Sequence, residues 1–233
     1  MEGEEFSRRS IVSMALAVEG GMGLVAIVLG WLLLPPPYFP FTWSAYGVGQ
    51  GVLAVLPMLA LLFVTVRWPI GPFRSLDQLM RQTLIPMFRQ CTVLDLVWIS
   101  ASAGIGEELL FRGVLQNGLA HFTGNVAFAI VAASIIFGVA HPLSLTYVAI
   151  VGVIGLYLGW LFVITDDLMV PIVAHGVYDF VALVYLLRRA SQSIELEFEA
   201  EQGGNIAAAE NNAPDEHDSA VDQDAADRGT VDS

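Results

Sequence analysis

Three short stretches in the second half of the chain carry side chains that could do chemistry. They read EELLFRG at 107–113, FGVAH at 137–141 and HGVYD at 175–179. Each lies within an apolar run, where an ionisable side chain is costly in lipid and by default marks a functional site. Glutamate, arginine, histidine and aspartate side chains on three such runs can meet only in a polar pocket. We therefore predict a site inside a helix bundle.

The 3.6-residue helical repeat separates the two adjacent glutamates. Glu108 and Arg112 are four residues apart on one face of a helix, so they can pair and reduce each other's cost in lipid. Glu107 is rotated by about 100° from Glu108 and lacks that partner. We therefore predict a structural Glu108–Arg112 pair and a Glu107 carboxylate that is available for chemistry.

The two histidines could complete a hydrolytic site. His175 and Asp179 are four residues apart on the last apolar run, and His141 comes just before a proline. A carboxylate and a histidine can together take a proton from water and make it a nucleophile. A second histidine and a hydrogen-bonding side chain can stabilise the oxyanion that forms at an attacked carbonyl. Hydrolysis of a peptide bond within the membrane fits these parts.

Each stretch alone also has a structural interpretation. A single intramembrane histidine is more often a hydrogen-bonding residue between helices than a catalyst. The Glu108–Arg112 pair alone would be a structural ion pair. Because all three stretches occur together, a functional site is favoured over a purely structural interpretation.

A metal site is conceivable, because histidine and carboxylate suit zinc. The sequence contains no H-E-x-x-H, however, and its single cysteine, Cys91, excludes a cysteine-based cluster and an internal disulfide. We therefore expect no cofactor and no metal. A metal-dependent enzyme would use Glu107, His141 and His175 as ligands.

The composition predicts a membrane protein. Of the 233 residues, 55% are hydrophobic and 14% are charged, against about 45–50% and about 25% in soluble domains. The net charge is −13, and the twelve acidic residues and one arginine from Ala190 onward supply −11 of it. A basic footprint is absent, which argues against nucleic-acid binding. Because lysine is absent as well, the chain looks prokaryotic, from a salt-adapted or high-GC organism.

Six apolar runs predict an all-α fold: a polytopic transmembrane helix bundle of about six spans. About 20 apolar residues cross the roughly 30 Å hydrocarbon core as a helix. The stretch 67–90, which carries four arginines, is instead predicted to be an interfacial amphipathic segment. The predicted spans are Ile11–Leu34, Ala45–Val66, Val93–Gln116, Asn125–His141, Leu145–Thr165 and Leu168–Leu187.

Arginine placement predicts the orientation. The pairs at 8–9 and 188–189 and the group within 67–90 all face the cytoplasm under the positive-inside rule, and six spans satisfy all three. Both termini are then cytoplasmic. The predicted organisation is a cytoplasmic N-terminus (1–10), a transmembrane bundle (11–190) and a disordered acidic tail (191–233), which is polar and lacks apolar periodicity.

Other residues within the spans receive structural interpretations. The pairs Gly47-x-x-x-Gly51 and Gly155-x-x-x-Gly159 indicate close helix packing inside one bundle rather than a dimer motif. Glu19 is expected to face the bundle interior or to lie near a boundary. Asp95 is expected to mark the interfacial start of the third span.

The ordered set of three motifs resembles the CPBP family of intramembrane proteases, which includes the prenyl-protein CAAX endopeptidases and bacteriocin-processing proteins. The family pattern is E-E-x-x-x-R, then F-x-x-x-H, then H-x-x-x-N or D. Each motif alone is weak, whereas the set in this order, with its LLFRG context, is strong. The match covers about Val93–Leu187, the second half of the membrane body.

The resemblance implies a role for each motif residue. Glu107 is the glutamate that activates water, and His141 assists it. Glu108 pairs with Arg112, and the ring of Phe137 packs the pocket.

His175 and Asp179 take the positions that the family assigns to oxyanion stabilisation, in a glutamic, metal-free mechanism. An ionised aspartate only accepts hydrogen bonds, whereas asparagine can donate one. Asp179 must therefore be protonated, or else serve to orient His175.

We therefore predict an integral membrane endopeptidase that hydrolyses peptide bonds of membrane-associated or lipidated substrates. One alternative is a non-catalytic scaffold or chaperone that binds peptides in the same pocket. The other is a proton-coupled transporter, against which no inverted repeat of broken helices is visible. The predicted spans place Glu107 and His141 at different depths, so the two meet only if the fourth helix is tilted or ends within the bilayer.

Overall fold

The computed structural model describes residues 7–36, 39–68 and 70–211, and the predicted tail beyond residue 211 lies outside them. Every regular element among these residues is helical, which confirms the all-α prediction. The elements in chain order are α1 (Arg8–Leu33), α2 (Ala45–Arg67), α3 (Pro72–Leu79), the π-helical segment η1 (Met80–Leu84), α4 (Ile85–Phe88), α5 (Val93–Glu108), the π-helical segment η2 (Leu109–Gln116), α6 (Asn117–Thr123), α7 (Val126–Val139), α8 (Leu145–Thr165) and α9 (Met169–Asn211).

Four of the described helices are long and apolar enough to cross a membrane, so the chain is an integral membrane protein. They are Arg8–Leu33, Ala45–Arg67, Leu145–Thr165 and, within α9, Met169–Gln192. The predicted third span is the start of a helical run that continues through α5, η2 and α6, and the predicted fourth span is the shorter apolar helix α7. The total of about six spans therefore stays a prediction.

The helices begin where the sequence offers a side-chain cap. At five helix starts, a serine, threonine or asparagine side chain accepts the backbone N–H three residues further on, which satisfies one of the donors left over at a helix N-terminus. These caps are Ser7, Ser44, Thr92, Asn125 and Ser144. Serine and asparagine between apolar runs thus mark the helix boundaries.

Asp95 lies in the first turn of α5, near the start of the third span as predicted. Its carboxylate completes a capping box with Thr92. It also accepts a hydrogen bond from the Arg8 guanidinium at 2.5 Å. The same side chain therefore caps α5 and ties its start to the start of α1.

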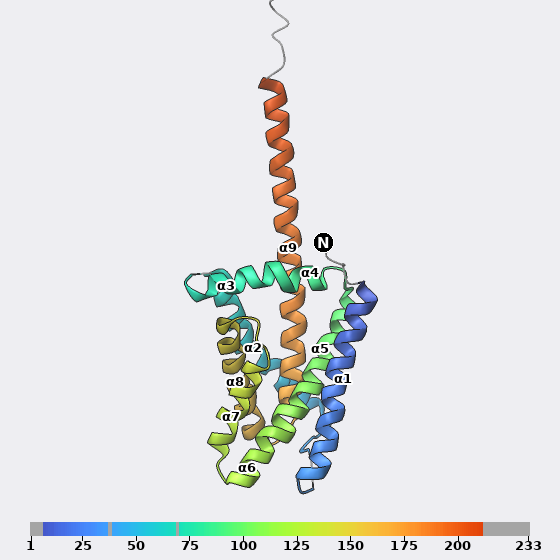
Figure 1. Ribbon diagram of the computed structural model, residues 1–233, viewed down its shortest axis with the longest axis vertical. Helices are drawn as coiled ribbons and strands as arrows, with labels where there is room; N and C mark the ends of the chain where they lie inside the picture. The colour runs from blue at the N-terminus through green and yellow to red at the C-terminus, as the bar shows by residue number, and fades with distance from the viewer. Residues whose placement is uncertain (1–6, 37–38, 69, 212–233) are drawn as a thin grey trace, which may run out of the picture. The chain divides into compact units, whose positions relative to one another are not determined.

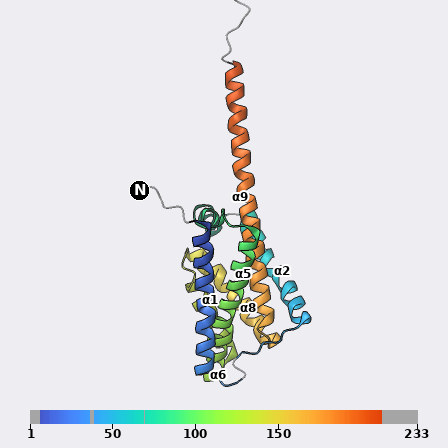
Figure 2. The same cartoon turned by 90° about the vertical axis from the view of Figure 1, so that its right-hand side faces the viewer.

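The run α5–η2 lies at the centre of the bundle (Figures 1 and 2). The helix α1 packs along one side of it, and the contacting pair α7 and α8 packs against η2 on another. The segment α3–α4 crosses the end of the bundle at which α1 and α5 begin (Figure 1). A second apolar core joins three helices, with Val55 and Met58 from α2, Ile154, Leu158 and Leu161 from α8, and Ala174 from α9.

The four glycines of the small-residue pairs all face neighbouring elements of the same bundle. A Cβ atom added at Gly51 would meet Val173 of α9, and one added at Gly47 would meet Met169. A Cβ atom at Gly155 would meet Phe137, and one at Gly159 would meet Gln116. These glycines therefore serve close packing within the chain, as the sequence indicates.

The backbones of α5 and α9 lie close together at Gly104. An added Cβ atom there would lie 2.8 Å from both the Ile172 carbonyl oxygen and the Gly176 nitrogen, and backbone atoms cannot move aside cheaply. We expect Gly104→Ala to destabilise the protein by about 1–3 kcal/mol through overpacking. The midpoint of thermal unfolding in detergent measures this.

The matched control for this change is Gly49→Ala in α2, where an added Cβ meets nothing within 4 Å. Alanine gains about 1 kcal/mol of helix propensity over glycine at such a position. Gly49→Ala should therefore leave the midpoint unchanged or raise it. Equal midpoints for the two variants would show that α5 and α9 are not in tight contact.

The predicted disorder of the tail from residue 191 is not confirmed: α9 is described as far as Asn211, and the rest of the tail lies outside the described residues. A boundary between two compact units falls after Ala190. Residues 191–211 are rich in alanine, glutamate and glutamine, which favour the helix, and they extend a helix that already exists without the cost of a new nucleus. Low apolar content does not by itself prevent an existing helix from extending.

Candidate active site

The Glu108–Arg112 pair forms as the four-residue spacing predicts. The Arg112 Nη1 donates to Glu108 Oε1 at 2.8 Å, and its Nη2 donates to the Gly155 carbonyl oxygen at 3.1 Å. One turn further, Gln116 donates to the Gly159 carbonyl at 3.0 Å. The side chains of the pair are 0–1% exposed. The missing side chains at the two α8 glycines let η2 approach closely enough for these bonds.

Phe137 packs against the charged pair and both histidines. Its ring centroid is 4.5 Å from the Arg112 guanidinium carbon, which is the geometry of a cation–π contact. The centroids of the His141 and His175 rings lie 4.9 and 5.9 Å away, in edge-on orientation. One aromatic ring thus holds the three motifs together.

Glu107 and His141 come together although the predicted spans placed them at different depths. Their Oε1 and Nε2 atoms are 3.6 Å apart. The helix α7 ends at Val139, two residues before His141, and its 14 residues rise only about 21 Å. This length is consistent with a fourth helix that ends within the bilayer, one of the two arrangements under which the residues could meet.

The hydrogen bond of His141 to the backbone determines which ring nitrogen carries the proton. Its Nδ1 lies 2.8 Å from the Phe137 carbonyl oxygen, which can only accept, so Nδ1 carries the proton. In the neutral ring, Nε2 then presents a lone pair toward Glu107. Two acceptors 3.6 Å apart can share one water molecule, which donates a hydrogen bond to each.

His175 connects the charged pair to the other carboxylates. Its Nδ1 lies 2.9 Å from Glu108 Oε1 and donates to it, because a carboxylate only accepts. Its Nε2 lies 3.4 Å from Asp179 Oδ2 and 3.8 Å from Glu107 Oε2. The ring is buried, and its two nitrogens lie near three carboxylates. Asp179 and Glu107 thus lie near the same nitrogen of His175.

One carboxylate oxygen of Glu107 is buried without a hydrogen-bond donor among the described residues. The residue is 6% exposed, and its Oε2 accepts no hydrogen bond from any part of the chain that the structure describes. Burial of such an oxygen costs free energy unless something donates to it. A buried, unsatisfied carboxylate beside a histidine is the arrangement expected of a group that acts on a ligand or on water.

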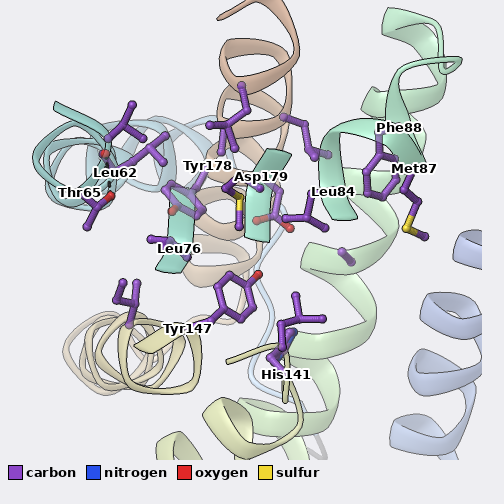
Figure 3. Close-up of a pocket in the computed structure, with 18 of the residues that line it drawn as sticks. Leu62, Thr65, Leu76, Leu84, Met87, Phe88, His141, Tyr147, Tyr178 and Asp179 are labelled. Atoms are coloured by element: carbon purple, nitrogen blue, oxygen red, sulfur yellow. Dashed lines mark hydrogen bonds between the residues drawn. The ribbon is translucent and has the colours of Figure 1, made fainter. Parts of the chain in front are cut away.

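A cavity of about 450 Å³ opens onto Glu107, His141 and Asp179 (Figure 3). Most of its wall is apolar and comes from α2, the segment α3–α4, α8 and α9. Residues of that apolar wall include Leu62, Leu76, Met80, Leu84, Met87 and Phe88. An apolar cavity with a few converging polar groups is typical of a ligand site. His175 is not among the lining residues and lies behind Glu107 and Asp179.

The sequence did not single out three polar residues on the cavity wall as parts of the site. Glu19 of α1 was expected at the bundle interior or a boundary, and it lines the cavity with its Oε2 buried and without a partner among the described residues. Tyr147 and Tyr178 line it as well. Tyr178 lies within the stretch HGVYD, at a position that the pattern H-x-x-x-N or D leaves open. Attention to the side chains at these open positions could have identified it. Tyr147 carries no signal of this kind.

The candidate ligands for a metal do not form a ligand set in this arrangement. Among residues 7–211, outside the gaps at 37–38 and 69, no three histidine, cysteine, aspartate or glutamate side chains are grouped closely enough to hold a metal ion. Both nitrogens of His175 are already engaged, with Glu108 on one side and carboxylates on the other. The donors therefore do not fit zinc as they stand.

A comparison with protein families finds a match over the part of the chain that contains the three motifs. Residues 89–181 match the family model described as Rce1-like, type II CAAX prenyl endopeptidase. No curated protein and no solved structure matches the chain. The matched segment begins at the end of α4 and runs to α9, so it contains all the motif residues. The match over residues 89–181 is consistent with the family of CPBP and CAAX proteases that the three motifs resemble.

Proposed function

We propose that the protein is an intramembrane endopeptidase in which Glu107 activates the attacking water. One observation carries this proposal: Glu107 Oε1 and His141 Nε2 are two acceptors 3.6 Å apart on the wall of a largely apolar cavity. A water between them donates a hydrogen bond to each and is positioned for deprotonation. The family match to a type II CAAX prenyl endopeptidase supports peptide-bond cleavage as the reaction.

The reaction then proceeds in two steps. Glu107 takes a proton from the water, and the hydroxide oxygen forms a bond to the carbonyl carbon of the scissile peptide. The carbonyl oxygen becomes an oxyanion. When the tetrahedral intermediate collapses, the C–N bond breaks and Glu107 returns its proton to the leaving amine, which regenerates the carboxylate. His141 holds the water and shares its proton through Nε2.

His175 supports this site from behind the cavity wall, and Asp179 supports it from the wall itself. Because Nδ1 of His175 donates to Glu108, only Nε2 can donate toward the cavity, and it does so only when the ring is protonated. Asp179 accepts from the same nitrogen and orients the ring. We propose that no metal takes part and that Glu107, assisted by His141, serves as base and acid.

We further propose six membrane crossings with both termini in the cytoplasm. The crossings are α1, α2, the run α5–η2–α6, α7, α8 and the first part of α9. The substrate is then a membrane-associated or lipidated peptide that reaches the cavity from the bilayer or its surface. The lysine-free chain favours a prokaryotic membrane, and no prenyl group on the substrate is proposed.

Comparison of protein N-termini in cells that carry wild type or Glu107→Ala at equal expression tests this function. We expect new termini that require Glu107, in membranes treated with or without a chelator alike. Termini that vanish with the chelator would contradict the metal-free mechanism. An absence of Glu107-dependent termini under several growth conditions would contradict the protease and favour the peptide-binding scaffold. Flux driven by a pH gradient in vesicles would favour the transporter.

A further inference from the structure

The cavity wall next to Glu107 is rich in acceptors and poor in donors. Besides Thr65 and two tyrosines, its polar side chains are the carboxylates of Glu19, Glu107 and Asp179 and the imidazole of His141. A carboxylate only accepts hydrogen bonds when it is ionised. An enzyme that attacks a carbonyl must instead present donors to the developing oxyanion. The donor to the oxyanion must therefore be a side chain other than these carboxylates.

Most donors near the site are already engaged. The Nδ1–H of His141 is used by the Phe137 carbonyl oxygen, at 2.8 Å. The Thr65 hydroxyl donates to the Leu62 carbonyl oxygen of its own helix, at 2.8 Å. Among the described side chains that line the cavity, this leaves two neutral donors, the hydroxyls of Tyr147 and Tyr178. A phenol keeps its proton at neutral pH, because its ordinary pKa is about 10.

Tyr147 is the better placed of the two. Its ring centroid lies 6.4 Å from that of His141, the residue that holds the water. Its backbone is fixed in the first turn of α8, where the Tyr147 N–H donates to the Ser144 hydroxyl at 3.1 Å. Figure 3 shows its hydroxyl end directed into the space between His141 and Asp179. In the same view, Tyr147 lies between Tyr178 and His141.

We propose that Tyr147 is a catalytic residue whose hydroxyl donates a hydrogen bond to the oxyanion of the tetrahedral intermediate. This inference rests on the proposed function of the same site. It accounts for the aspartate at position 179, where an ionised side chain cannot donate to an oxyanion. It also accounts for the position of His175 behind the cavity wall. The phenol takes over the donation that an asparagine at position 179 could provide.

The test is Tyr147→Phe, assayed on an internally quenched peptide that spans a cleavage site found in the comparison of N-termini. Loss of one oxyanion donor lowers kcat by about 10²–10³-fold. We expect a loss of that size with KM within a factor of about two, because the donor acts only in the transition state. Tyr178→Phe is the matched control and should lower kcat by less than about tenfold. Both variants keep the ring, so their thermal unfolding midpoints should equal that of wild type.

A second substitution distinguishes donation from packing. In the Tyr147→Phe background, Asp179→Asn introduces an amide that can donate, and we expect it to recover kcat by at least about tenfold. Wild-type kcat in Tyr147→Phe, a change in KM alone, or an equal loss in Tyr178→Phe would overturn the inference while leaving the protease intact. If wild type and Glu107→Ala both leave the peptide uncut, the proposed function and this inference fail together.

Discussion

Glu107→Gln is expected to lower kcat/KM for peptide cleavage by about 10²–10⁴-fold, the contribution of a positioned general base. Glutamine has nearly the same shape, and its amide still fits the wall beside His141. An amide cannot take a proton from water, so the attacking hydroxide does not form. Folding should be unaffected, because Glu107 Oε2 makes no hydrogen bond with the described chain that the substitution could break. Cleavage of the quenched peptide in detergent measures the effect.

The matched control for this loss is Asp166→Asn, also a change from acid to amide. Asp166 is exposed and caps the end of α8 in the left-handed conformation, with φ of 49°. Asparagine adopts this conformation readily, so both activity and stability should equal those of wild type. Activity of Glu107→Gln within a factor of about three of the control would exclude Glu107 as the base.

Glu108→Ala is expected to destabilise the protein by about 3–5 kcal/mol, the cost of breaking a buried ion pair from one side. The substitution leaves the Arg112 guanidinium, which is 1% exposed, without its carboxylate. It also removes the acceptor of His175 Nδ1. The variant should therefore accumulate poorly in the membrane and unfold at a lower temperature, and lost activity should follow lost folding.

The double variant Glu108→Gln, Arg112→Gln separates charge from shape. It removes both charges together, so no uncompensated ion remains buried, and it should recover at least half of the stability lost in Glu108→Ala. Midpoints of thermal unfolding in one detergent compare the three proteins. A Glu108→Ala protein with the midpoint of wild type and no cleavage would instead place Glu108 in the chemistry itself.

Local spacing was sufficient to predict the contacts within one helical run. The four-residue interval joins Glu108 to Arg112 and brings His175 near Asp179, and the structure has both contacts. The 100° rotation predicted that Glu107 would lack the Arg112 partner, and its Oε2 is unsatisfied. These inferences hold because a helix fixes the relative directions of nearby side chains whatever surrounds it.

The spacing of residues along the sequence could not predict contacts between different helices. The meeting of Glu107 and His141 depends on where α7 ends, and a span predicted as Asn125–His141 did not show that the regular helix ends at Val139. Tyr147 reaches the cavity because α8 packs against α7, which no local pattern encodes. The sequence analysis placed the end of the last span at Leu187, whereas α9 extends to Asn211, because adding a turn to an existing helix needs no new nucleus.

The short α7 also bears on the bilayer around the protein. Its outward side carries Phe128, Val131, Ile135 and Val139 as exposed apolar side chains, so lipid covers it. A helix that rises about 21 Å beside a hydrocarbon core of roughly 30 Å creates hydrophobic mismatch, which lipids relieve by thinning locally. Thinned lipid beside α7 would lie next to His141 and Glu107. The headgroups, and water with them, would then come closest to Glu107 and His141 on that flank, which would shorten the path of water into the cavity of the proposed hydrolase.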